Sequence, residues 1–497
     1  MTIAPETKTI APLLIGGAWQ RPETARFTSI YNPSTGEPIG ATPMCGAEEV
    51  DQAVQAAARA FPAWAATPAP RRADVMFRYR ALLEANFDEL SRLITQENGK
   101  TLEEARGDLR RGLEVVEYAC GIAQLSKGEN LPQVAANIDG MTMREPLGVC
   151  VGITPFNFPA MVPMWMFPLA IACGNTFVLK PSEKVPLTAV RLAELLEQAG
   201  LPVGVFNLVH GGREVVDALC SHPGVAAVSF VGSSAVALHV YQLASHHGKR
   251  AQCGGGAKNV LVVMPDADPD STLRAIMGAS FGCAGQRCMA GSLLMGVGEV
   301  ADALRDRLVA AAEGLRVADT SADPAAEMGP VIDDLAQARI RRTIGAAAAE
   351  PGARLVRDGR AGVPERGFFV GPTLLDHVTP DMALFREEVF GPVLGMLRPA
   401  NLDEAIALMR RVPYGNGATI FTSSGASARQ FAREMPCGMI GVNVGVPAPM
   451  ALFPFAGWNH SFYGDLHMQG TEGVAFYTRQ RVVLSRWDST YQRQQGW

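Results

Sequence analysis

Short apolar segments alternate with longer segments of helical period between residues 175 and 263. The apolar segments predict strands at 175–180, 205–209, 225–231 and 260–263. Helices are predicted between them, at 182–200 and from 232 to about 248. Strands that alternate with helices of this length form a parallel sheet covered on both faces. The sequence therefore predicts an α/β fold, in which ligands bind at the carboxyl ends of the strands.

Two of these strands end at residues that suit a nucleotide. Lys180 and Glu183 follow the first strand, and a carboxylate can accept hydrogen bonds from ribose hydroxyls. Ser182 is predicted to cap the helix between the first two strands. Gly232-Ser233-Ser234 opens another helix, where free N–H groups and the helix dipole favour a phosphate. This is not the G-x-G-x-x-G fingerprint, so a phosphate site and an ordinary helix cap both remain open.

A second informative stretch is Phe281-Gly-Cys-Ala-Gly-Gln-Arg-Cys-Met-Ala-Gly291. A thiolate is a strong nucleophile, but an ordinary thiol is mostly protonated near neutral pH and needs a nearby cation or dipole. Arg287 is a candidate for that cation beside Cys288. Gly282 and Gly285 permit close approach of the backbone or a positive φ. A glycine-rich turn with inert, buried cysteines is the alternative interpretation.

Composition narrows the class of protein. The chain has 497 residues, enough for two to four domains, and a formal charge of -5 without a basic block, which argues against nucleic-acid binding. Nine scattered cysteines without a CxxC pair favour free thiols in a reducing, cytoplasmic compartment and no metal site. The first fourteen residues lack the features of a secretory signal. Residues 146–179 carry no charge, but their prolines favour buried protein interior over a membrane span.

Helical and strand-like segments flank this region. Residues 80–94 predict one amphipathic helix with Leu83, Phe87, Leu90 and Ile94 on its buried face. A second helix carries Arg110 and Arg111, which in most helices would be solvated. Residues 127–148 predict a strand pair that leaves the main body, and 482–484 an edge strand that pairs with another subunit.

Five motifs, in order and in register, resemble the aldehyde dehydrogenase superfamily. They are Pro155-Phe-Asn-Phe-Pro159, Lys180-Pro-Ser-Glu183, Phe230-Val-Gly-Ser-Ser234, Gly285-Gln-Arg-Cys288 and Glu387-Glu-Val-Phe-Gly-Pro392. The resemblance implies a Rossmann-type NAD-binding domain (1–126 and 147–255), an α/β catalytic domain (256–455) and a small β oligomerisation flap (127–146 and 466–497). It also implies assembly as a homodimer or homotetramer.

The resemblance assigns roles residue by residue. Cys288 corresponds to the nucleophile that attacks the aldehyde, and the Asn157 amide with the Cys288 N–H to the oxyanion hole. The expected cofactor contacts are Thr154, Phe156, Lys180, Glu183, Ser233, Glu388 and Phe390. A carboxylate at Glu183 would repel a 2′-phosphate, which favours NAD over NADP.

The chain departs from the hydrolytic members of the superfamily at one position. Those members carry a glutamate just before a Gly-Gly pair, which activates the water that cleaves the thioester. The corresponding run is Arg250-Ala-Gln-Cys-Gly-Gly-Gly-Ala-Lys-Asn259, and no Asp or Glu occurs from Ala218 to Pro265. An acyl-enzyme without this base should persist until a thiol such as coenzyme A attacks it.

One branch fits this departure, and the chain resembles it at Phe156–Pro168, Gly255–Asn259, Gln286–Met289 and Arg111–Glu117. It is the coenzyme-A-acylating methylmalonate-semialdehyde dehydrogenase branch of valine catabolism. It implies that Arg111 and Arg287 hold the substrate carboxylate. It also implies that methylmalonate or malonate semialdehyde is oxidised and decarboxylated to propanoyl- or acetyl-CoA.

Small departures from this branch leave alternatives open. Cys253, Gly254 and Cys283 replace its usual residues, and Gly254 is expected to loosen its loop. Cys253 raises the further possibility of a second, oxidisable thiol near Cys288, but the favoured interpretation is a small buried residue tolerated where no base is needed. A hydrolytic semialdehyde dehydrogenase with a base from elsewhere, and a homologue that binds without turnover, are the two competing interpretations.

Overall fold

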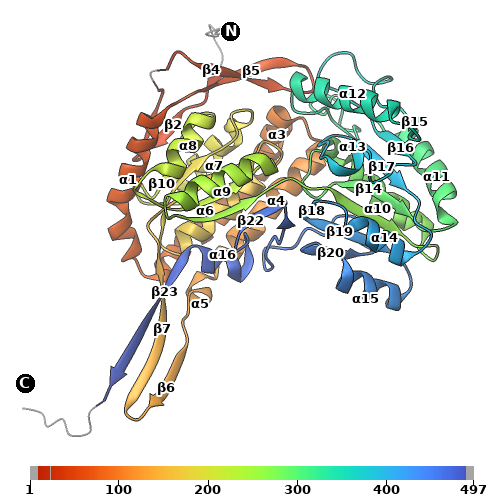
Figure 1. The fold of residues 1–497 in the computed structure, drawn as a ribbon. Helices are drawn as coiled ribbons and strands as arrows, with labels where there is room; N and C mark the ends of the chain where they lie inside the picture. The colour runs from red at the N-terminus through yellow and green to blue at the C-terminus, as the bar shows by residue number, and fades with distance from the viewer. Residues whose placement is uncertain (1–8, 23, 488–497) are drawn as a thin grey trace, which may run out of the picture.

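The computed structural model describes residues 9–22 and 24–487. Two large sheets, each with helices packed on it, lie side by side, and a narrow β flap projects from the body (Figure 1). The predicted α/β fold is therefore confirmed.

The first sheet has eight strands in the order β22-β12-β11-β8-β9-β10-β2-β3. Its parallel centre is β8 (Val149–Ile153), β9 (Thr176–Lys180), β10 (Phe206–Leu208), β11 (Val225–Val231) and β12 (Arg250–Gly254). Antiparallel strands close both edges: β2 (Leu13–Ile15), β3 (Ala18–Gln20) and β22 (Phe462–Gly464). Strands β9, β10 and β11 confirm three of the four strands predicted from the alternating pattern. The fourth, 260–263, is a strand as predicted, but it belongs to the second sheet.

Alternate side chains of the central strands enter two different cores. Val149, Val151 and Ile153 pack in one core with α1 (Ala47–Ala65), α8 (Arg213–Ser221) and α9 (Ser234–His246). Phe177 and Leu179 pack in the other, with helices α2 to α7. The bounds of the helices on this second face are α2 Ala69–Ala85, α3 Phe87–Asn98, α4 Leu102–Cys120, α5 Ile122–Leu125, α6 Met161–Ala172 and α7 Pro186–Gln198. Burial on both faces explains why these strands are apolar throughout.

The second sheet has seven strands in the order β15-β16-β17-β14-β13-β19-β20. They are β13 (Asn259–Val263), β14 (Gly291–Gly296), β15 (Arg354–Arg357), β16 (Thr373–Asp376), β17 (Val393–Leu397), β19 (Gly417–Phe421) and β20 (Met439–Val442). The associated helices are α10 (Pro269–Phe281), the 3₁₀ turn η1 (Gly282–Gly285), α11 (Val300–Gly314), α12 (Asp334–Ala349), α13 (Ala383–Arg386), α14 (Leu402–Met409) and α15 (Gly425–Glu434). The chain passes from the first sheet to the second between β12 and β13.

The helix predicted over 80–94 is wrong as a single element. The structure breaks it at Asn86, which ends α2 and precedes α3. The Asn86 side chain donates to the Leu82 carbonyl at 2.8 Å, a local hydrogen bond that competes with helix continuation. Leu83, Leu90 and Ile94 are nevertheless buried as predicted.

The predicted cap of α7 is also wrong. Ser182 accepts a hydrogen bond from Lys184 N–H in a turn, and α7 begins four residues later at Pro186. The N–H groups of Leu187 and Thr188 instead donate to the carboxylate of Glu97, at 2.8 and 2.9 Å. This buried cap comes from α3, some ninety residues earlier in the chain.

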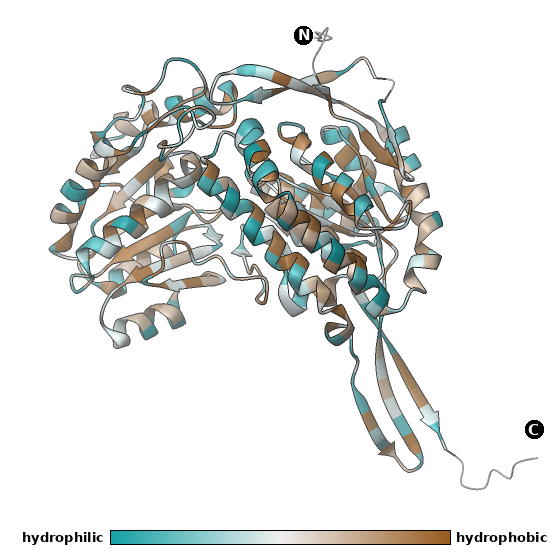
Figure 2. Cartoon of the chain, turned by 180° about the vertical axis from the view of Figure 1, so that it is seen from behind, coloured by the Kyte–Doolittle hydropathy of each residue, from teal (hydrophilic) through white to brown (hydrophobic). Residues whose placement is uncertain are grey.

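The flap consists of β6 (Asn130–Ala135), β7 (Ile138–Pro146) and β23 (Thr478–Arg486) in an antiparallel sheet. Polar and apolar residues alternate along it (Figure 2). Helix α16 (Gly470–Phe476) falls within the range predicted for the flap, yet it packs against α6 of the body. Residues 1–8 and 488–497 of the predicted domain ranges lie outside the described residues.

Two small sheets complete the fold. One joins β1 (Thr9–Ile10), β4 (Phe27–Asn32) and β5 (Glu37–Pro43), and the other β18 (Tyr414–Gly415) and β21 (Trp458–Asn459). The charge-free stretch 146–179 forms β8, α6 and β9, all buried. Among the residues that the structure describes, no helix has the length and apolar character needed to cross a bilayer.

Candidate active site where two cavities meet

Cys288 lies in the loop between η1 and β14, and two asparagine side chains, one from β13 and one from the residue before β19, hold its backbone. The Cys288 carbonyl accepts hydrogen bonds from Asn259 Nδ2 at 2.8 Å and Asn416 Nδ2 at 2.9 Å. The side chain of Gln286 accepts from Ile332 N–H at 3.1 Å. The loop is thereby fixed at both sides of the thiol.

The turn before this loop needs its two glycines for different reasons. Gly285 has φ +68°, and a Cβ there would lie 2.2 Å from the Gly391 carbonyl oxygen. Gly282 has no positive φ, but a Cβ there would lie 2.3 Å from the Arg287 guanidinium. Both uses of glycine expected from the sequence therefore occur. Cys283 and Ala284 also adopt left-handed φ values, 50° and 51°.

Two cavities meet at Cys288. One, of about 290 Å³, lies between α4, α6 and the loop of residues 446–455, and the other, of about 930 Å³, follows the strand ends of the first sheet. Among the described residues, Cys288 alone lines both. It is partly exposed, whereas the other eight cysteines are buried, and all nine are free.

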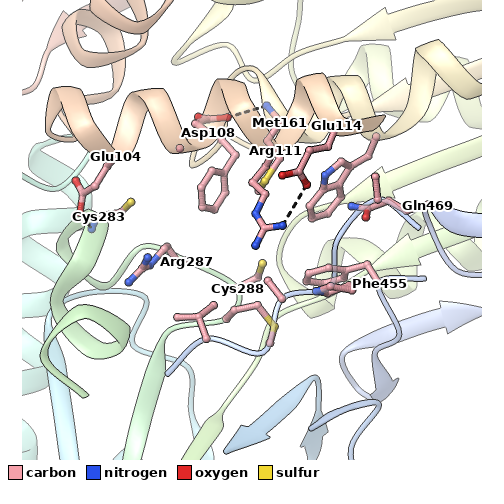
Figure 3. A pocket seen from close by; sticks show the side chains of 18 residues that line it. Glu104, Asp108, Arg111, Glu114, Met161, Cys283, Arg287, Cys288, Phe455 and Gln469 are labelled. Atoms are coloured by element: carbon pink, nitrogen blue, oxygen red, sulfur yellow. Dashed lines mark hydrogen bonds and ion pairs between the residues drawn. The ribbon is translucent and has the colours of Figure 1, made fainter. Parts of the chain in front are cut away.

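The smaller cavity combines an apolar wall with charged groups (Figure 3). Phe158, Met161, Trp165, Met289 and Phe455 supply apolar surface. Three acidic side chains, Glu104, Asp108 and Glu114, come from one face of α4. Sequence reasoning did not single out these three, although their spacing of four and six residues on one helix is visible in the sequence.

Arg111 and Arg287 line this smaller cavity but have different partners. Arg111 reaches from α4 toward Cys288 and pairs with Glu114 at 3.1 Å (Figure 3). The Arg287 guanidinium is turned from Cys288 toward α10, where it donates to the Gly278 carbonyl. Its buried Nε has no partner among the described residues. The two cations share one cavity, although no contact joins them.

The larger cavity gathers every residue predicted to contact a cofactor: Thr154, Phe156, Lys180, Glu183, Ser233, Glu388 and Phe390. Five of them lie at or just after the carboxyl ends of β8, β9 and β11, and Glu388 and Phe390 lie in the loop between α13 and β17. Lys180 Nζ lies 3.2 Å from Glu183, and the rings of Phe156 and Phe390 meet edge to face at 5.8 Å. The buried hydroxyl of Thr154 has no partner among the described residues. Ser233 caps α9 only by position, since its side chain makes no cap hydrogen bond.

Asn157 lines the larger cavity beside Cys288. Its Nδ2 donates to the Gln286 carbonyl at 3.1 Å, which orients the side-chain amide. A primary amide has two N–H donors, so a second one remains for a ligand.

The surroundings of Cys288 favour its neutral form. Burial raises the pKa of the Cys288 thiol to about 12, and the Glu388 carboxylate adds to the rise. N–H groups of Cys288 and Met289 and the Arg287 cation act weakly in the opposite direction. Arg287 therefore does not activate the thiol in this arrangement, because burial outweighs its field.

Glu388 is held beside the thiol by a network that the sequence did not reveal. Burial raises the pKa of Glu388 to about 7, although the Ala257 N–H donates to its carboxylate at 2.8 Å. Lys258, fully buried, donates to the Glu387 carbonyl at 2.8 Å, and burial lowers its pKa to about 8. Arg339 also lines the larger cavity. Lys258 stands in the branch motif Gly255–Asn259, but no role was predicted for it, and Arg339 carries no motif signal that separates it from surface cations.

The family follows from these positions together with the sequence. The sequence profile of the aldehyde dehydrogenase family matches residues 19–483. The chain belongs to the aldehyde dehydrogenase family. Within this family it is 51% identical, over 95% of its length and 98% of the relative's, to malonate-semialdehyde dehydrogenase 2 of Geobacillus kaustophilus.

Two solved members of the family have very similar structures. Methylmalonate-semialdehyde dehydrogenase from Oceanimonas doudoroffii has a TM-score of 0.95 and 47% identity, over 97% of this chain and 99% of that one. A protein from Sinorhizobium meliloti, solved in complex with NAD, has a TM-score of 0.95 and 45% identity, over 98% and 99%.

Two departures from the family pattern, Cys253 and Gly254, both lie in β12. Gly254 lies in β12, paired with Val231 and Phe462, so the expected loosening of a loop is wrong. A Cβ at Gly254 would make only ordinary contacts, the nearest at 3.5 Å. Cys253, also in β12, is wholly buried in the core that this strand shares with α1, α8 and α9, and it lines neither cavity. Cys283, not Cys253, is the second thiol that shares the smaller cavity with Cys288.

Proposed function

We propose that this aldehyde dehydrogenase oxidises malonate or methylmalonate semialdehyde with NAD and transfers the acyl group to coenzyme A. The observation that carries the proposal is that Cys288 alone, among the described residues, lines both cavities. One cavity has two guanidinium groups, of Arg111 and Arg287, that can receive the carboxylate of the aldehyde, and the other has the volume and groups to receive a dinucleotide. The names of the relatives at 51% and 47% identity support the substrate class.

The larger cavity fits NAD on its own features. The orphaned hydroxyl of Thr154 supplies an unused polar group, and a Cβ at Gly256 would lie 2.3 Å from the Glu388 carboxylate, so glycine keeps this part open. Glu183 and Lys180 would hold the adenosine ribose, Ser233 the pyrophosphate, and Glu388 with Phe390 the nicotinamide ribose. The Glu183 carboxylate disfavours a 2′-phosphate. Bound NAD would accept the hydride that leaves the aldehyde carbon.

Catalysis begins with the Cys288 thiolate, which adds to the aldehyde carbon. The Asn157 N–H and the Cys288 backbone N–H would hold the resulting oxyanion, where fixed dipoles replace water. Loss of hydride from this adduct leaves a thioester on Cys288. Arg111 and Arg287 would hold the substrate carboxylate before it leaves as bicarbonate or CO₂. To bind the substrate carboxylate, Arg111 would give up its ion pair with Glu114, and Arg287 would give up its hydrogen bond to the Gly278 carbonyl.

Release of the acyl group distinguishes coenzyme A from water. The family's glutamate is missing from the run that includes Cys253, and most carboxylates of the two cavities are engaged: Glu104, Asp108, Glu114 and Glu183. Glu388 differs from them in its pKa, which burial raises to about 7, although the Ala257 N–H donates to one of its oxygens. A hydrolytic alternative would therefore use Glu388 as its base, while the acylating reaction needs only a second thiol.

Product analysis tests the proposal. The purified protein, malonate or methylmalonate semialdehyde and NAD should give one NADH burst per Cys288 without coenzyme A, and sustained acyl-CoA formation with it. The Cys288→Ala variant should give neither. Sustained formation of a free acid without coenzyme A, abolished by Glu388→Gln, would support the hydrolytic alternative instead. Binding of NAD without any burst would identify a homologue that does not turn over.

A further inference from the structure

We propose that the buried ion pair Lys100–Asp108 is a positioning device that sets the Asn157 amide for catalysis. The inference rests on the oxyanion role proposed for Asn157. Lys100 and Asp108 do not touch the reacting atoms in this arrangement. Their effect would pass through the backbone of residues 156–161, between β8 and α6. In this segment Phe156 and Asn157 line the larger cavity, and Phe158 and Met161 line the smaller one.

Lys100 has three contacts, and two of them involve this segment. Its Nζ lies 3.0 Å from Asp108 Oδ2 and donates to the Asn157 carbonyl oxygen at 2.7 Å. The same ammonium lies over the Phe158 ring, 4.2 Å from the centroid. Lys100 is placed by the left-handed Gly99, φ +88°, which ends α3 just before it.

Asp108 holds the other end of the segment from the buried face of α4. Its Oδ1 accepts the Met161 N–H at 2.7 Å, while its Oδ2 faces Lys100. Asn98 adds a third attachment to the backbone of this segment, because its Nδ2 donates a hydrogen bond to the Phe156 carbonyl at 2.9 Å. One network thus attaches to carbonyls of Phe156 and Asn157 and to the N–H of Met161, and so spans the residue that bears the amide.

The burial of this pair argues that it does more than fill space. The Lys100 and Asp108 side chains are 1% and 0% exposed. Taking two charges out of water costs several kcal/mol per ion, so a buried pair contributes little net stability compared with apolar residues of the same shape. It does impose geometry, since each charge must meet its partners. The Asn157 backbone is held by Lys100 and its side chain by the Gln286 carbonyl, which together restrict both ends of the residue.

A neutral double variant separates geometry from charge. Lys100→Met with Asp108→Asn leaves no unpaired buried charge, and the oxygen of the new side-chain amide can still accept the Met161 N–H. Only the hydrogen bond to the Asn157 carbonyl and the contact with the Phe158 ring lose their cation. Asp108→Asn alone retains the Lys100 donor and serves as the conservative variant.

We expect the double variant to bind NAD and to react with iodoacetamide at Cys288 at near wild-type rates. Its NADH burst should slow by about tenfold or more, as for a displaced oxyanion donor, while the KM for semialdehyde changes less than about threefold. Asp108→Asn leaves the buried Lys100 ammonium without its counter-ion and should lower Tm, but it should slow the burst less than the double variant, because Lys100 can still donate to the Asn157 carbonyl. Lys249→Met is the matched control: Lys249 is also a buried lysine that donates to two carbonyls, of His222 and Val225, but far from the site. It should lower thermal stability without slowing the burst.

Asn157→Ala separates failure of this inference from failure of the proposed function. If Asn157→Ala slows the burst and the folded double variant does not, Lys100 and Asp108 have no positioning role, although the proposed function stands. If Asn157→Ala also leaves the burst unchanged, the oxyanion role itself is wrong. If the NADH burst slows equally in the double variant and in Lys249→Met, Lys100 and Asp108 contribute only to stability, and the inference is overturned.

Discussion

Cys288, the proposed nucleophile, is mostly protonated in the free protein. Its thiol has a pKa of about 12, raised first by burial and then by the Glu388 carboxylate. A reactive cysteine normally has a lowered pKa. This site differs, and the aldehyde dehydrogenase must therefore gain its thiolate when ligands change the surroundings of the sulfur. A positively charged nicotinamide in the larger cavity would act in that direction.

Alkylation of Cys288 by iodoacetamide should therefore follow the thiolate fraction. We expect the rate to rise about tenfold per pH unit between pH 7 and 9 without levelling off, because the pH remains below the thiol pKa. Glu388→Gln should raise the rate at pH 8, where Glu388 with its pKa of about 7 is ionised, and should change it little at pH 6. The rate is measured by peptide mapping against Cys288→Ala. Glu183→Gln, a carboxylate of the same cavity that does not shift this thiol, is the control. A plateau below pH 8 would contradict the assignment.

The 3₁₀ turn η1 sets the direction of the loop that carries Cys288. It places Cys283, Ala284 and Gly285 in succession at positive φ, and it ends three residues before Cys288. Such conformations cost about 1–3 kcal/mol for residues with a side chain and persist where surrounding contacts enforce them. The contacts here are the close approach of Gly285 to Gly391 and of Gly282 to Arg287.

Gly285→Ala should therefore destabilise the protein and displace Cys288. The new Cβ would meet the Gly391 carbonyl oxygen, so we expect a loss of about 1–3 kcal/mol, seen as a lower Tm, and a weaker NADH burst. Gly278→Ala is the matched control in the adjacent helix α10. A Cβ at Gly278 has no atom within 4 Å, so this change should leave Tm unchanged or raise it. A Gly285→Ala protein with wild-type Tm and burst would show that the turn tolerates a side chain.

At the scale of the whole molecule, the larger cavity, the Cys288 loop and the exposed apolar residues belong to different parts of the fold. The larger cavity lies along the strand ends of the first sheet, while the loop with Cys288 belongs to the second. The flap extends away from both (Figure 1) and exposes apolar side chains that a monomer would leave in water: Leu131, Val134, Met141, Met143, Val482 and Leu484. Exposed apolar edge strands are typical pairing surfaces. We therefore propose that the flap joins copies of this chain as a homodimer or homotetramer.

Charges on the flap should break this assembly. We expect the wild-type protein to have the mass of a dimer or tetramer, and the double variant Val482→Asp, Leu484→Asp to shift toward the monomer with unchanged circular dichroism, because buried carboxylates oppose the interface. Light scattering after size exclusion measures the mass. Leu335→Asp, at an equally exposed apolar residue on α12, should leave the assembly intact. A monomeric wild-type protein would sink the proposal.

The sequence by itself determined the α/β class, three of the eight strands of the first sheet and, through the family resemblance, the residues that meet at Cys288. The strands follow from local pattern, because apolar runs such as residues 225–231 form strands, and Lys180, Glu183 and Ser233 stand at strand ends, which parallel strands bring to one edge. Asn157, Glu388 and Phe390 were predicted only through the resemblance to the aldehyde dehydrogenases. The tertiary structure alone decided the break between two helices at Asn86, the capping of α7 by Glu97 and the burial of Cys253. It also decided that Lys100, paired with Asp108, donates to the Asn157 carbonyl. Periodicity reports which face of an element is buried. It does not report which polar group, 57 or 90 residues away, meets a given backbone atom, because that depends on the path of the whole chain.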